Sequence, residues 1–95
     1  MIRAIHFSDE ARFLKLRYAG SFMVDLWTGQ RAGQTPDVFQ VYCPCGCGRR
    51  STFAATEGAG DGVIWTGRLT ELSLSEPVPL ARGWWRCVDG YWEAF

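Results

Sequence analysis

The stretch VFQVYCPCGCGRRSTFAAT, residues 38–56, places three of the chain's four cysteines within five residues. The flanking segments 38–43 and 49–56 contain β-branched and aromatic residues, which favour strands. A proline and two glycines lie between these segments and favour a turn. We therefore expect a β-hairpin that carries Cys43, Cys45 and Cys47 at its tip.

The spacing of these cysteines favours metal binding over disulfides. A disulfide prefers Cα atoms ~5.5–6 Å apart in defined torsions, so a bridge between alternate residues would be strained. Alternate residues of a strand point the same way, and a glycine-relieved turn lets their side chains converge. Zn²⁺ prefers four ligands in a tetrahedron and accepts thiolate sulfur. We predict a structural Zn²⁺ bound by Cys43, Cys45, Cys47 and Cys87, the last supplied by the final hairpin.

Other interpretations of the cysteines stay open at this point. If one cysteine is a bystander, His6, the only histidine, is the natural substitute ligand, and otherwise it is an ordinary strand residue. Cys87 is alternatively a small buried apolar residue between aromatic side chains. The cluster would also suit an iron site, redox-active thiols or inert cysteines. A closed site of four thiolates would stabilise the fold rather than catalyse a reaction, because it has no open coordination position.

Outside the hairpin, apolar residues recur mostly with a period of two, as in strands. The alternation in RFLKLRY, residues 12–18, favours a strand, although Asp9-Glu10 would also suit the start of a helix over 9–19. Asp89-Gly90, between WWRCV and YWEAF, is typical of a tight hairpin turn. The other expected strands are 21–28, 63–66 and 69–74, and the expected loops are 29–37 and 57–62.

These patterns predict a small all-β fold, a zinc-stabilised antiparallel sheet with hairpins and little helix. A length of 95 residues indicates a single domain over residues 1–95. Hydrophobic residues make up 47% of the chain and five tryptophans are present, which excludes a disordered chain. Because a domain of this size is only marginally stable alone, a bound metal would add useful stability.

The charge balance excludes some classes of partner. Ten basic residues balance ten acidic ones, so the basic surface of a general nucleic-acid binder is absent.

No apolar run approaches the ~20 residues that span a bilayer, and the N-terminal residues show no apolar signal segment. We therefore expect the cytoplasm of a bacterial or phage-infected cell, where thiols stay reduced and clustered cysteines favour metal binding.

A candidate binding surface lies in the last hairpin and beside the cysteines. Trp84 and Trp85 are adjacent, so on a strand they point to opposite faces. One would join the core, and the other, with Trp92, would form an exposed aromatic patch suited to anchoring an interface. Alternatively, all five tryptophans build the core. Arg49 and Arg50 complete the candidate surface, although such basic clusters are commonly just solvated.

Four motifs together resemble a known family: CPCGCG at 43–48, WTG at 65–67, LSLSEP at 72–77 and VDGYW at 88–92. The similarity covers roughly residues 38–95 and is to a family of small bacterial and phage proteins, catalogued as domain of unknown function six-five-two-seven. The late strand of that family carries a cysteine and a histidine, whereas here it carries Cys87 and no histidine. The resemblance implies a zinc-binding β-domain, often encoded by phages or prophages, with no known activity.

The sequence favours a binding module over an enzyme. No phosphate-binding loop, CxxC redox motif or nucleophile–base spacing is visible. Because the net charge is zero, we expect a protein partner, either a host protein that the module inhibits or modulates or a larger assembly that it stabilises as a subunit. The alternative is a zinc β-domain that binds single-stranded nucleic acid, with affinity that falls steeply as salt rises. Exposed edge strands and aromatic residues are also compatible with a dimer.

Overall fold

The expected small all-β fold is confirmed in a computed structural model, which describes residues 2–25, 37–58 and 62–95. Along these ranges the strands form one sheet of order β2-β3-β4-β5-β6 and a second of order β1-β9-β8-β7. Most pairings are antiparallel as expected, but β2–β3 and β5–β6 are parallel. The elements are β1 (Ile2–Arg3), β2 (Ile5–His6), α1 (Glu10–Leu16), β3 (Ser21–Asp25), β4 (Asp37–Tyr42), β5 (Arg50–Glu57), β6 (Ile64–Trp65), β7 (Val78–Pro79), β8 (Trp84–Val88) and β9 (Tyr91–Ala94).

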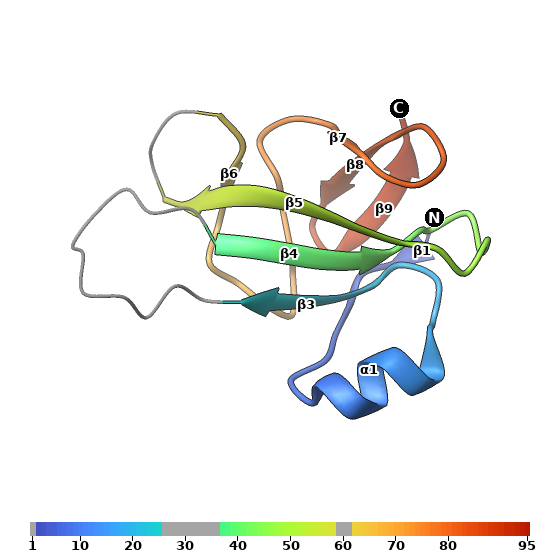
Figure 1. The fold of residues 1–95 in the computed structure, drawn as a ribbon. Helices are drawn as coiled ribbons and strands as arrows, with labels where there is room; N and C mark the ends of the chain where they lie inside the picture. The colour runs from blue at the N-terminus through green and yellow to red at the C-terminus, as the bar shows by residue number, and fades with distance from the viewer. Residues whose placement is uncertain (1, 26–36, 59–61) are drawn as a thin grey trace.

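The hairpin predicted from residues 38–56 is present as β4 and β5, the two longest strands in Figure 1. Its register pairs Phe39 with Phe53 and Tyr42 with Arg50. Phe39 is fully buried, and its ring stacks on Phe53 at 4.9 Å and meets the edge of Trp65 at 5.0 Å. This aromatic packing fixes the orientation of the hairpin, and with it the position of the turn that carries the cysteines.

The prediction of a strand over residues 12–18 was wrong, because residues 12–16 lie in helix α1, which begins at Glu10. The Asp9 side chain accepts a hydrogen bond from the Ala11 N–H at 3.0 Å, which caps the helix. Arg17 ends it in the left-handed conformation, with φ of 49°. Phe13 is the fully buried residue of α1 and its ring lies 4.8 Å from that of Tyr42, so the helix covers the residue that precedes Cys43.

Other predicted boundaries changed to a smaller extent. The expected strand 69–74 is not formed, and within it only Leu74 makes an isolated bridge, to Trp65. Backbone groups of this segment bond to the last hairpin instead: Leu74 N–H donates to Cys87 O and Leu72 O accepts from Gly90 N–H. Residues 26–28, 29–36 and 59–61 of the expected strand and loops lie outside the described residues.

The turn at Asp89-Gly90 joins β8 and β9 as predicted. Both residues have positive φ, 51° and 86°, which suits a tight two-residue hairpin turn. The register places Cys87 opposite Trp92. Because side chains alternate along a strand, Trp85 and Cys87 share the buried face with Trp92.

Gly20 links the two sheets at the start of β3. Its N–H donates to Tyr42 O at 2.9 Å, and its carbonyl accepts from Trp92 Nε1 at 3.0 Å. It has φ of +80°, and a Cβ there would lie 2.9 Å from Arg3 O and 3.0 Å from Trp92 Cδ1. Only glycine fits this close approach of β1, β4 and β9.

Buried residues of both sheets form a single cluster that includes both buried cysteines. The cluster consists of Ala4, Phe22, Phe39, Val41, Cys43, Ala55, Trp65, Leu72, Leu74, Val78, Leu80, Trp85, Cys87 and Trp92.

No helix among the described residues has the length and hydropathy needed to span a membrane.

Candidate metal centre

The β4–β5 turn is closed by backbone hydrogen bonds that bring its cysteines together. Cys43 N–H donates to Arg49 O at 2.9 Å, and Gly46 N–H donates to Cys43 O at 3.1 Å. The second bond defines a β-turn with Pro44 at its favoured position. Gly46 and Gly48 both have positive φ, 88° and 79°, which lets the chain curl back on itself.

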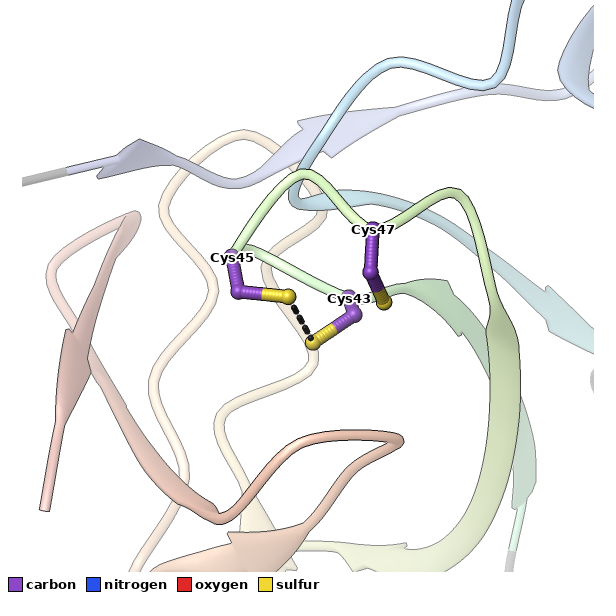
Figure 2. Close-up of side chains that lie close together, drawn as sticks. All are labelled: Cys43, Cys45 and Cys47. Atoms are coloured by element: carbon purple, nitrogen blue, oxygen red, sulfur yellow. Dashed lines mark hydrogen bonds between the residues drawn. The ribbon is translucent and has the colours of Figure 1, made fainter.

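The three sulfur atoms of the turn lie close enough to share one metal ion. Cys43, Cys45 and Cys47 have Sγ atoms all within 4.8 Å of one another, and the side chains point into the space between them (Figure 2). The Cys43 and Cys45 sulfurs are hydrogen-bonded at 3.2 Å. In a tetrahedral zinc site with Zn–S bonds of about 2.3 Å, sulfurs lie about 3.8 Å apart. Each pair therefore needs a change of no more than about 1 Å to reach that geometry.

The site spans the boundary between core and solvent. Cys43 is fully buried, whereas Cys45 and Cys47 are exposed. The buried sulfur continues the inward side of β4, where Phe39 and Val41 alternate with more exposed residues. Cys43 thus connects the turn to the hydrophobic core, while the other two thiols remain open to solvent.

The protonation of the cluster is uneven. A backbone hydrogen bond from Arg49 lowers the pKa of Cys47, and the neighbouring thiols and the positive charge of Arg82 lower it further. The hydrogen bond with Cys43 raises the pKa of Cys45, because it favours the protonated form. Cys47 is therefore the first of these two thiols to ionise, and a metal ion would displace the remaining protons.

The structure does not bring Cys87, the predicted fourth ligand, into this group. Among the described residues the group consists of the three turn cysteines. Cys87 lies on the core face of β8, and its Sγ donates to Leu72 O at 3.3 Å. Burial raises the pKa of Cys87 to about 12, so its neutral thiol is the stable form. Cys87 thus has the surroundings of a buried apolar residue, the alternative considered above.

His6, the substitute ligand, is also placed apart from the cysteines. It lies in β2, half-buried, with its ring 5.4 Å from that of Phe22. Burial lowers the pKa of His6, which favours the neutral imidazole. It does not join the cysteine group that the described residues form.

The predicted binding surface is only partly a surface. Trp84 is 55% exposed, and Arg49 and Arg50 are exposed beside the turn. Trp85 and Trp92 are core residues instead, because they share the inner face with Cys87. Their indole N–H groups donate to Arg82 O at 2.7 Å and to Gly20 O at 3.0 Å. A two-residue turn at Asp89-Gly90 pairs Cys87 with Trp92, so the sequence alone could have placed Trp92 on the same face as Trp85.

Two features were missed from the sequence. Arg82, in the β7–β8 connection, acts electrostatically on Cys47. A hollow of about 390 Å³ lies next to Trp84, lined also by Glu76, Pro77 and Phe95. No local motif marks either feature, since both depend on how segments distant in sequence come together.

Comparisons with known proteins find no matching family model, no matching curated protein and no matching solved structure. The family resemblance of residues 38–95 therefore stays a prediction.

Proposed function

We propose that the chain is a non-catalytic binding module stabilised by Zn²⁺, which the thiolates of Cys43, Cys45 and Cys47 bind. The observation that carries this is the placement of three Sγ atoms within 4.8 Å on one turn. Thiolates are ligands that zinc and other soft or borderline ions prefer. Zinc also suits a structural role because it has no redox chemistry of its own.

The metal would stabilise the fold through Cys43. Cys43 is buried in the core cluster, and the hydrogen bonds of its backbone close the β4–β5 turn. Binding an ion there ties the exposed turn residues to the core, and unfolding would release the ion. Three thiolates and Zn²⁺ carry one net negative charge, and the positive charge of Arg82, which acts on Cys47, helps to offset it.

The experiment for this part compares unfolding with and without a chelator. A chelator lowers the unfolding midpoint of the zinc-loaded wild type, because it removes an ion that binds only the native state. Cys45→Ser is the test variant and exposed Ser8→Ala the matched control. The control responds to chelator as the wild type does, and the test variant responds weakly. Equal responses to chelator in wild type and Cys45→Ser would contradict the proposal.

The binding surface in this proposal is the outer face of β8 and β9. Trp84 and Phe95 are 55% and 75% exposed, and Val88 and Tyr91 are exposed on the same face. Arg86 pairs with Glu93 across these strands at 3.7 Å, and its guanidinium lies 6.0 Å from the centre of the Phe95 ring. An exposed tryptophan surrounded by apolar and paired charged groups is typical of a protein interface.

The partner is proposed to be a protein rather than a nucleic acid. The zero net charge of the chain offers little of the counterion release that drives nucleic-acid binding. The family resemblance favours a bacterial or phage-encoded module that modulates a host protein. Trp84→Ala should abolish capture of such a partner, and Tyr18→Ala, a similarly exposed aromatic outside this face, should leave it unchanged. Equal capture by both variants would remove Trp84 from the interface.

A further inference from the structure

The turn cysteines supply three metal ligands, while zinc takes four. Within residues 2–25, 37–58 and 62–95, no fourth cysteine, histidine or carboxylate joins the group. Cys87 is engaged with Leu72 O in the core, and His6 packs against Phe22. Cys87 and His6 thus make contacts of their own, away from the three turn cysteines.

The open side of the group faces solvent. Cys45 and Cys47 are both exposed, and Cβ atoms added at Gly46 or Gly48 would meet nothing within 4 Å. An ion bound to these sulfurs therefore has free space on the side away from Cys43. A ligand from outside the chain reaches it without rearranging the fold.

The surrounding charges favour an anionic ligand. Exposed Arg49 and Arg50 follow the turn directly, and the charge of Arg82 acts on Cys47. Arg82 helps to offset the single net negative charge of a three-thiolate zinc site, and Arg49 and Arg50 add positive charge to the same turn. A neutral imidazole gains little from this field, whereas a thiolate gains Coulomb energy and matches the softness of the site.

Resting on the zinc site proposed above, we infer that the ion keeps one coordination position open to solvent and that an external thiolate occupies it. The step is a ligand exchange. The external thiol gives its proton to solvent, its sulfur bonds to the ion, and a bound water leaves. No oxidant or reductant is consumed, and the three protein thiolates stay bound. The site would thereby recognise an accessible cysteine of another protein or a small thiol.

The test replaces zinc by Co²⁺, whose sulfur-to-metal charge-transfer absorption grows with the number of bound thiolates. The cobalt-loaded wild type starts with the intensity of three thiolates. Titration with 2-mercaptoethanol raises that intensity by about one third and then saturates, as the count goes from three to four. An intensity that does not change on titration overturns the inference. A response to imidazole in place of the thiol overturns it as well.

The same titration separates the inference from the proposed function. Absence of any charge-transfer band on adding Co²⁺ refutes the three-cysteine site itself, whereas a band that ignores added thiol refutes only the open position. Cys87→Ala is the control, and it should match the wild type before and after titration. Loss of about a quarter of the initial wild-type intensity in this variant would assign the fourth sulfur to Cys87 and overturn the inference. If the variant does not fold, the wild-type titration still decides.

A second arm identifies the source of the thiolate. A short peptide with one cysteine, and the same peptide with serine, are titrated under the same conditions as 2-mercaptoethanol. Saturation by the cysteine peptide at lower concentration indicates a protein cysteine, and equal saturation indicates any accessible thiol. Both results support the inference. An equal response to the serine peptide contradicts thiolate coordination.

Discussion

Replacing Gly20 by alanine tests how the metal-bearing hairpin is joined to the rest of the fold. The Gly20 N–H donates a hydrogen bond to the carbonyl of Tyr42, the residue before Cys43. The Gly20 carbonyl accepts a hydrogen bond from the Trp92 indole in the other sheet. Its φ of +80° alone makes alanine unfavourable by about 1–2 kcal/mol. The new Cβ would also lie 2.9 Å from Arg3 O and 3.0 Å from Trp92 Cδ1. Overpacking of this kind costs about 1–3 kcal/mol more.

The expected loss of unfolding free energy in Gly20→Ala is therefore about 2–5 kcal/mol, a large share of the stability of a small domain. Chemical denaturation at equilibrium measures it. Gly58→Ala is the matched control, because Gly58 has the same φ of +80° but open space around its Cβ position. The control should lose only about 1–2 kcal/mol. Equal losses in the two variants would refute the argument that Gly20 is a close junction between the sheets.

The remaining predictions concern the buried thiol, the helix cap and thiol reactivity. Burial raises the pKa of Cys87 from 9.0 to about 12. Between these pH values only the unfolded chain loses the thiol proton, so the free energy of unfolding falls as the pH rises, by up to about 1.4 kcal/mol per pH unit. Cys87→Ala should flatten this alkaline loss in denaturation curves measured from pH 8 to 11, and an unchanged slope would contradict the burial. Asp9→Ala should cost about 1 kcal/mol of unfolding free energy through loss of the α1 cap, while adjacent Ser8→Ala should cost almost none. In metal-free protein, iodoacetamide should modify Cys47 before Cys45 and Cys87 last, as read by peptide mass spectrometry; early modification of Cys87 would refute its placement.

The β4–β5 hairpin was predictable because its signals agree. Strand-forming residues flank a turn of proline, glycine and cysteine, and the same pattern that predicts the turn predicts convergence of the thiols. The Asp89-Gly90 turn was equally clear, because positive φ at two successive positions restricts the choice of residues. In both cases the deciding interactions are local in sequence.

Each failed prediction has a physical reason. In the short α1 segment, alternation and helical spacing overlap, and the cap at Asp9 decides between them. Cys87 matched the zinc ligand count, but its side of β8 is set by packing with Trp85 and Trp92 against the other sheet. The predicted strand 69–74 does not form, because the backbone groups of Leu72 and Leu74 make hydrogen bonds to the last hairpin. Contacts between distant segments decide the cases of Cys87 and of residues 69–74, whereas a local cap decides the case of α1.

Native mass spectrometry of zinc-supplied protein shows whether the three turn cysteines bind one metal ion. We expect one Zn²⁺ per wild-type chain, one per chain in Cys87→Ala, and none in the Cys45→Ser, Cys47→Ser double variant. Metal-free wild type, or a double variant that binds zinc as the wild type does, would contradict it.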